Sequence, residues 1–159
     1  MTKNLKSLAS TLAVLIILIV GTAVVEAAQS ATLNVDGNDS ACNDDPGDPY
    51  CTIQGAINAA TSDDSIIVAA GTYTETLDLG GKSLTITGAG LGTTTVDASQ
   101  ASGYAISNFG NSTTVQELKL IGSGHYGFKV SHVSDITLKN IRVENSGKTG
   151  VDLNTVSGA

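Results

Sequence analysis

A repeat in the second half of the chain restricts its possible folds more than any other feature. VQELKLIGSGHYGFKVSHVS (115–134) aligns with LKNIRVENSGKTGVDLNTVS (138–157), and the strong apolar positions of the two copies coincide. A fainter earlier copy aligns GYAI (103–106) with GFKV (127–130). Repeats of about 20–50 residues are typical of solenoids and propellers.

Within each copy, apolar and polar residues alternate, as in Leu118-Lys-Leu120 and Phe128-Lys-Val130. This is the pattern of a strand with one buried face. The segments SIIVAAG, TETLDL and SLTITG continue it upstream, with Gly, Asn and Ser at the intervening turns. A propeller blade needs about 40 residues or more, and the Leu frame of leucine-rich repeats is missing from the sequence. The repeat therefore predicts an all-β parallel solenoid of roughly four coils over residues 65–159.

The N-terminal segment, residues 1–28, has the pattern of a secretory signal peptide. Lys3 and Lys6 precede an apolar run from Thr11 to Val25, and VEA ends in a small-residue cleavage site at Ala27. The alternative is an uncleaved membrane anchor, although a spanning helix needs about 20 apolar residues. We expect a secreted, extracellular or cell-surface protein that contacts membrane through this segment if it is not cleaved.

The charge of the remaining chain argues against nucleic acid as a partner. Without Lys3, Lys6 and Glu26 the chain keeps six basic and fourteen acidic residues, and no Lys or Arg lies between residues 29 and 81. Binding to phosphate depends on clustered Lys and Arg. An acidic surface of this kind suits a soluble exported protein.

Residues 29–64 form an acidic loop followed by a short helix. The two cysteines of the chain, Cys42 and Cys51, are predicted to pair as a disulfide, since exported cysteines usually do. Two free thiols or a metal-binding pair are the alternatives. In the segment TIQGAINAA, apolar residues at i, i+3, i+4 and i+7 predict an amphipathic helix with Thr52 as its N-cap. We expect this helix to cover the exposed end of the first coil.

The acidic loop holds a candidate calcium site. Its oxygen-rich aspartates are the kind of ligand that Ca²⁺ prefers, and they are Asp36, Asp39, Asp44, Asp45 and Asp48. The order is not that of an EF-hand loop, and Pro46, Gly47 and Pro49 are turn residues. A solvated structural loop is therefore the alternative. No other cofactor is predicted.

The segment from Thr52 to Ser99 resembles the opening coils of the pectin-lyase-like right-handed parallel β-helix superfamily. It is most similar to the start of pectinesterases and of bacterial and archaeal surface proteins. GTYTE (71–75) matches the Gly-x-Tyr-x-Glu signature of pectinesterases, and ITLKNIRVENSG (136–147) is similar to a coil of the superfamily. The resemblance implies a single-stranded right-handed β-helix with a short N-terminal capping α-helix.

The catalytic residues that this resemblance implies have no counterparts in the sequence. Where pectinesterases place a glutamine, the run KTGVDLN has Gly150 and Val151, and the nucleophilic Asp and the Arg find no match before Ala159. A calcium-dependent lyase needs a column of carboxylates, but the repeat puts Glu117 on Asn140. We therefore predict no catalytic residue within the chain.

Tyr104 and Tyr126 fall in predicted turns, where their rings are candidates for stacking on a sugar. His125 and His132 are predicted to be solvated turn residues. The first functional hypothesis is a non-catalytic scaffold that binds, or is displayed at, cell-surface carbohydrate. The alternative is the N-terminal part of a carbohydrate-active enzyme, pectinesterase-like or pectate-lyase-like. Self-association through an open C-terminal coil is a further prediction.

Overall fold

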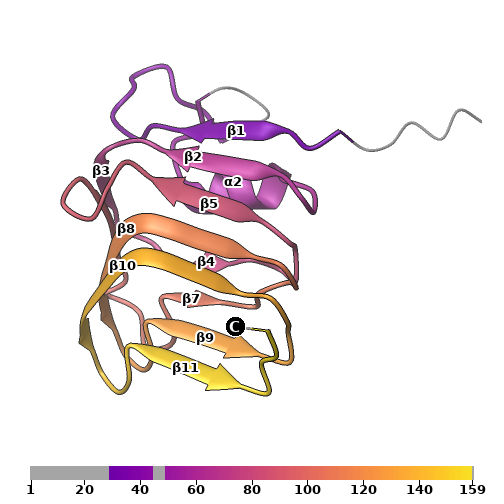
Figure 1. Cartoon of the computed structure of the whole chain (residues 1–159). Coiled ribbons are helices and arrows are strands. Elements are labelled where there is room, and N and C mark those ends of the chain that lie inside the picture. The colour runs from indigo at the N-terminus through magenta and orange to yellow at the C-terminus, as the bar shows by residue number, and fades with distance from the viewer. Residues whose placement is uncertain (1–28, 45–48, 159) are drawn as a thin grey trace, which may run out of the picture.

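The computed structural model describes residues 29–44 and 49–158, and their strands stack as a parallel β-solenoid (Figure 1). The prediction of an all-β solenoid with one short helix near its start is confirmed. The elements are β1 (Thr32–Val35), α2 (Ile53–Ala59), β2 (Ser65–Val68), β3 (Gly71–Tyr73), β4 (Leu77–Asp78), β5 (Thr85–Gly88), β6 (Thr94–Asp97), β7 (Ile106–Ser107), β8 (Thr114–Ser123), β9 (Phe128–Ser131), β10 (Thr137–Ser146) and β11 (Val151–Asn154).

The strands form two parallel sheets that make three faces. The seven-stranded sheet has the order β1-β2-β5-β8-β6-β3, with β10 also paired to β8. The first part of β8 pairs with β5 and its later part with β6, so this sheet folds around a corner. We call the side with β1, β2 and β5 the first face and the side with β3 and β6 the second face. The four-stranded sheet β11-β9-β7-β4 is the third face.

The register confirms the main repeat and corrects the earlier copy. Leu118 pairs with Ile141 and Leu120 with Val143, as the alignment predicted. The alignment of GYAI with GFKV, which puts Ile106 on Val130, is wrong, because Ile106 pairs with Phe128. The side chains of Ile106 and Phe128 are fully buried. Their packing decides the register, whereas the glycines that suggested the other alignment contribute no side chain to the core.

The core consists of inward columns in which each coil contributes one apolar residue per strand position. One column of the first face runs through Leu33, Ile66, Ile86, Val115 and Leu138. The three middle side chains are completely buried, and the two end ones are partly exposed. Full burial of such a side chain stabilises a fold by about 1.5–3 kcal/mol. Stacking of coils is therefore the main source of stability.

Left-handed backbone recurs at the same places in successive coils. β8 changes partners from β5 to β6 at Glu117, whose φ is 59°. Such a conformation lets an extended chain turn sharply, and it favours Gly and Asn. Positive φ occurs at equivalent positions of the two aligned copies, as the pairs Glu117 and Asn140, Gly122 and Asn145, His132 and Thr155, and Asp135 and Gly158.

The predicted helix and its N-cap are confirmed. Thr52 has extended backbone, and its hydroxyl accepts a hydrogen bond from the Gly55 N–H at 2.9 Å. The apolar stripe that begins at Ile53 is buried, including Ala60 just beyond the end of the helix. A helix of seven residues is too short to be stable alone. Its burial against β1, β2 and β4 holds it in place.

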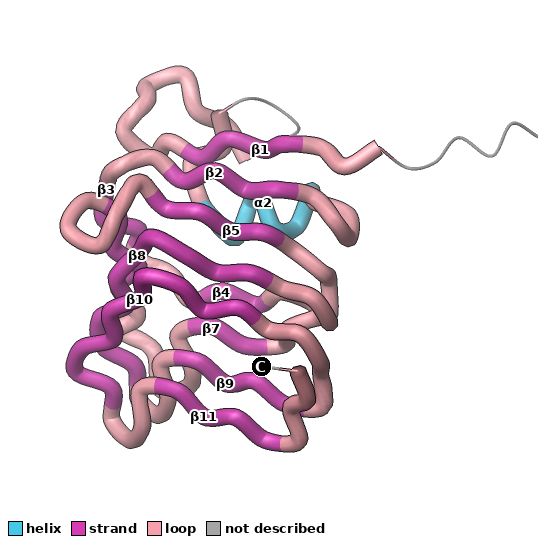
Figure 2. The backbone as a smooth tube through the Cα atoms, in the orientation of Figure 1, coloured by secondary structure: helices cyan, strands magenta, loops and turns pink. Residues whose placement is uncertain are grey.

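α2 covers the end of the third face in place of another strand (Figure 2). The Gln54 side chain accepts from the Asp78 N–H at 2.8 Å and donates to the Asp78 carbonyl at 3.2 Å. It thus satisfies both backbone groups of an edge residue of β4, as a strand would. At the other end of α2, the Lys82 ammonium donates to the carbonyls of Ile57 and Asn58, where a cation is favoured.

Strand β1 was not predicted. It lies in the stretch interpreted as loop and pairs in parallel with β2 from Thr32 to Val35. Beyond it, Tyr50 forms a bridge to Val35. The alternation in TLNV is too short to separate a strand from a loop by pattern alone.

Asp64 fastens the start of β1 to the loop before β2. Its carboxylate is buried and accepts from the Ala31 N–H at 2.6 Å and from the Thr61 N–H and hydroxyl at 2.7 and 2.9 Å. Burial raises the pKa of the Asp64 carboxyl, but these hydrogen bonds and the Lys82 charge outweigh it. The pKa therefore lies below its ordinary value.

Substitution of Asn145 tests the left-handed corners. Asn145 is exposed and has φ 58°. Asn145→Val should lower the free energy of unfolding by about 1–2 kcal/mol, because a β-branched residue is strained there. Asn145→Gly should change it by less than about 0.5 kcal/mol. Urea unfolding followed by circular dichroism measures both, and equal losses in the two variants would contradict the explanation.

Asp64→Asn should destabilise the protein by about 1–3 kcal/mol at neutral pH, because the donors around the carboxylate lose charge-assisted hydrogen bonds. A carboxyl group with a lowered pKa stabilises the fold above its unfolded pKa of about 3.9 and loses this effect as pH falls through the folded pKa. The difference between the wild type and the variant should therefore shrink below about pH 4. Asp63→Asn, at an exposed position, is the control. A pH-independent difference would contradict this account.

Candidate functional site

Three hollows follow one another along the corner between the second and third faces. The first, of about 180 Å³, lies beside Cys51, and the second, of about 240 Å³, shares Thr74 and Glu75 with it. The third, of about 450 Å³, shares Gln100 and Ala101 with the second. Neighbouring hollows share lining residues, and we call the three hollows together the corner groove.

The first end of the corner groove is built by the GTYTE segment. Glu75 accepts hydrogen bonds from the N–H groups of Ile53 and Gln54 at 3.0 and 2.8 Å. Its carboxylate therefore caps the N-terminus of α2 from a different coil. Tyr73 is buried. Burial raises the pKa of the Glu75 carboxyl above its ordinary value, although the two hydrogen bonds oppose this effect.

The disulfide between Cys42 and Cys51 is present, as predicted. It joins the acidic loop to the residue before the N-cap of α2. Asp44 reinforces this junction, since one carboxylate oxygen accepts from the N–H groups of Cys51 and Thr52, and the other accepts from the Thr52 hydroxyl. The loop and the start of the helix are thus held together by covalent and polar contacts.

The aspartates proposed for calcium serve local turns where the structure describes them. Asp36 and Asp39 each accept a hydrogen bond from the N–H two residues ahead, and Asp44 accepts from Cys51 and Thr52 just before the helix. Asp45 and Asp48 lie outside the described residues. Within 29–44 and 49–158, no three His, Cys, Asp or Glu side chains gather closely enough to hold a metal ion. The calcium site stays a prediction, which titration with CaCl₂ tests.

The structure brings the two predicted aromatic residues together beside the groove. The rings of Tyr104 and Tyr126 are stacked, with centroids 5.8 Å apart and an interplanar angle of 5°. The pairing of β7 with β9 places them on neighbouring coils. His125 meets both rings edge-on at 6.0 Å. Tyr104 is 37% exposed and lines the third hollow, which Tyr126 does not reach.

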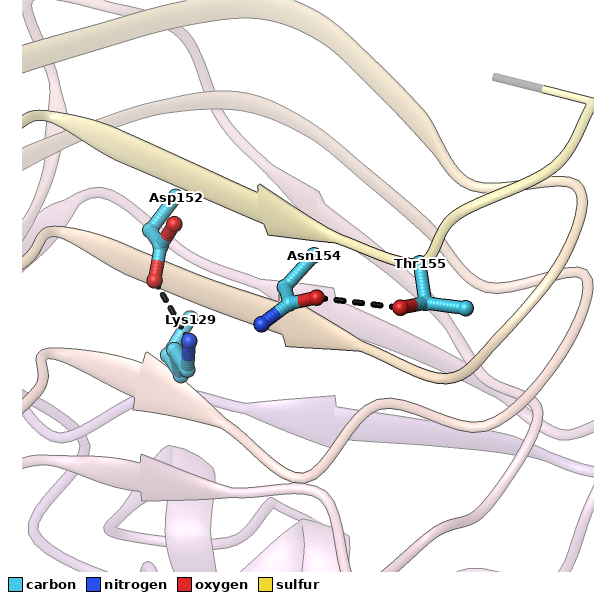
Figure 3. Close-up of polar contacts among 4 residues, drawn as sticks. All are labelled: Lys129, Asp152, Asn154 and Thr155. Carbon is cyan, nitrogen blue, oxygen red and sulfur yellow. Dashed lines mark hydrogen bonds and ion pairs between the residues drawn. The ribbon is translucent and has the colours of Figure 1, made fainter.

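Two ammonium groups lie over the Tyr126 ring. The Nζ atoms of Lys129 and Lys148 are 5.7 and 5.9 Å from its centroid, within the range of a cation–π contact. Lys129 also pairs with Asp152, its partner in the register of β9 and β11 (Figure 3). The hydrogen bond to Asp152 raises the pKa of Lys129. These contacts surround the ring of Tyr126, on which Tyr104 stacks.

The carboxylates of the later coils do not converge. Glu117 accepts from Asn140, and Glu144 pairs with the exposed Arg142. Asp152 is paired with Lys129. Each of these contacts joins positions on one or two coils rather than several groups around a shared centre, so they do not form the constellation that an acid–base mechanism needs.

Sequence reasoning missed the roles of Glu75, Gln54 and Gln100. The resemblance to pectinesterases singled out Glu75 but could not show that it caps a helix that precedes it in the chain. Gln54 and Gln100 stand among other polar residues without a pattern that marks them. Their partners and surroundings come from other coils, and hence become visible only in the folded chain.

No protein-family model matches the chain, and neither do the curated proteins or the solved structures with which it was compared. Over residues 29–44 and 49–158, the structure contains no helix long and apolar enough to cross a membrane. The predicted signal segment, residues 1–28, lies outside the described residues.

Proposed function

We propose that the protein is a secreted or cell-surface β-solenoid that binds a glycan in the corner groove. The observation that carries this proposal is the partly exposed ring of Tyr104, which borders a hollow of about 450 Å³ and is backed by the ring of Tyr126. The disulfide and the solenoid fold are compatible with an extracellular location. The proposed signal peptide supports the same location.

A sugar ring combines an apolar C–H face with hydroxyl groups at its rim. An aromatic side chain offers a flat apolar surface to the C–H face of the sugar, and nearby polar groups can form hydrogen bonds with its hydroxyl groups. Gln100, Ser102 and Ser107 line the same hollow as Tyr104. A few polar groups around an apolar contact are the usual composition of a small-molecule site.

Tyr104 is held in place before any ligand arrives. Its stacking on Tyr126, which in turn lies under Lys129 and Lys148, restricts the rotation of the ring. Binding to a side chain that is already ordered costs less conformational entropy. This arrangement supports a binding role rather than a packing role for Tyr104.

The proposal includes membership of the pectin-lyase-like superfamily, which rests on the resemblance of residues 52–99 and on the parallel coils. The alternative function, part of a carbohydrate-active enzyme, rests on the Gly-x-Tyr-x-Glu segment. Here Glu75 is bound to the N-terminus of α2. Since this segment has a structural task, we favour binding over catalysis.

Tyr104→Ala should weaken glycan binding about tenfold or more, because it removes the central aromatic contact. Tyr104→Phe should keep most of the affinity, since it retains the ring. A glycan microarray would identify ligands, and isothermal titration would measure the variants. Ile67→Ala, at an exposed apolar position on the first face, is the control. Equal affinities of wild type and Tyr104→Ala would refute the proposed site.

A further inference from the structure

We propose that the corner groove selects glycans that carry free amino groups over glycans that carry uronic acids. This inference rests on the proposed function and assigns a ligand class to the same site. It follows from three features of the described groove: the sign of its charges, a lining without cations, and the aromatic face at its end.

The charged side chains among the described residues that line the groove are all carboxylates. Glu75 and Asp97 line the second hollow, and Asp78 lines the third. Of the described residues around the three hollows, none is Lys or Arg. A recess lined by charges of one sign raises the local concentration of ligands of the opposite sign. These three carboxylates would repel a chain of uronates, whereas Lys129 and Lys148 lie over Tyr126 outside the lining.

Asp97 and Asp78 are hydrogen bonded to neutral groups rather than to a protein cation. Hydrogen bonds from Ser99 lower the pKa of Asp97, so that it is ionised in mildly acidic and neutral solution. Asp78 accepts from the neutral Asn108 amide, at 2.9 Å to each oxygen, and from the Gly80 N–H. The ion pairs found among the described residues, Lys129–Asp152 and Arg142–Glu144, involve neither carboxylate.

The aromatic end of the groove favours the same ligand class. An ammonium group is attracted to the face of a tyrosine ring. The ring that lines the hollow is Tyr104, whereas the Lys129 and Lys148 ammonium groups lie over Tyr126, which does not line it. Tyr104 lines the third hollow together with Asp78. An amino sugar in this hollow would place its pyranose ring against Tyr104 and its ammonium group near a carboxylate. A neutral sugar would gain only the contact between its pyranose ring and Tyr104.

The experiment compares three oligosaccharides of equal length on the full chain: a glucosamine oligomer, its N-acetylated form and an oligogalacturonate. Isothermal titration at low salt and about pH 6, where a primary amine is protonated, should rank them in that order of affinity. The advantage of the glucosamine oligomer should disappear in about 1 M NaCl, where charges are screened.

Asp97→Asn should weaken binding of the glucosamine oligomer about two- to fivefold and leave the N-acetylated form unchanged. Asn can still accept the Ser99 hydrogen bond, which preserves the turn. Asp63→Asn removes one charge from an exposed loop residue outside the groove lining and should change neither affinity. Asp78→Asn gives a second measurement if the first variant is unstable.

Equal affinity for the glucosamine oligomer and its N-acetylated form at low salt would overturn the proposed selectivity while leaving a glycan site in place. Tighter binding of the oligogalacturonate would also overturn it. Binding of none of the three sugars would also overturn the selectivity. Unchanged affinity of Tyr104→Ala for a glycan that binds the wild type would show instead that the groove is not the binding site. The two proposals therefore fail in different ways.

Discussion

The whole structure depends on in-register parallel pairing between successive coils. Adjacent strands in such a sheet lie about 4.8 Å apart, and each pairing fixes which side chains stack in the core. The column from Leu33 to Leu138 and the stacked rings of Tyr104 and Tyr126 are consequences of the same register. A change of one residue in pairing would turn inward side chains outward. Core and candidate site are therefore specified together.

The two described ends of this stack differ in how far their strand edges are covered. At the first end, polar side chains replace the missing neighbours: Gln54 pairs with the backbone of β4, Glu75 caps α2, and Asp64 holds the start of β1. Unpaired strand edges invite association with other chains. At β10 and β11, the last described strands, Leu153 is 53% exposed. Self-association there stays a prediction.

Features that depend on local periodicity could be predicted from the sequence. Alternation and the repeat indicated the solenoid, and the apolar stripe from Ile53 indicated the helix. Features set by long-range packing could not. The pairing of Ile106 with Phe128 depends on the burial of both side chains, and the groove depends on turns from different coils. The two tyrosines were recognised as candidates, but their stacking required the correct register.

Successive coils differ in length at the corner between the second and third faces. Gly71 on β3 pairs with Thr94 on β6, and Leu77 on β4 pairs with Ile106 on β7. The segment 94–106 is therefore longer than the segment 71–77 that it stacks on, and the additional residues lie in the turn that carries Gln100 and Tyr104. Both ladders stay in register across this insertion. Evolution or protein engineering can therefore lengthen or exchange this turn and alter recognition, because the strands that fold the protein do not depend on its length.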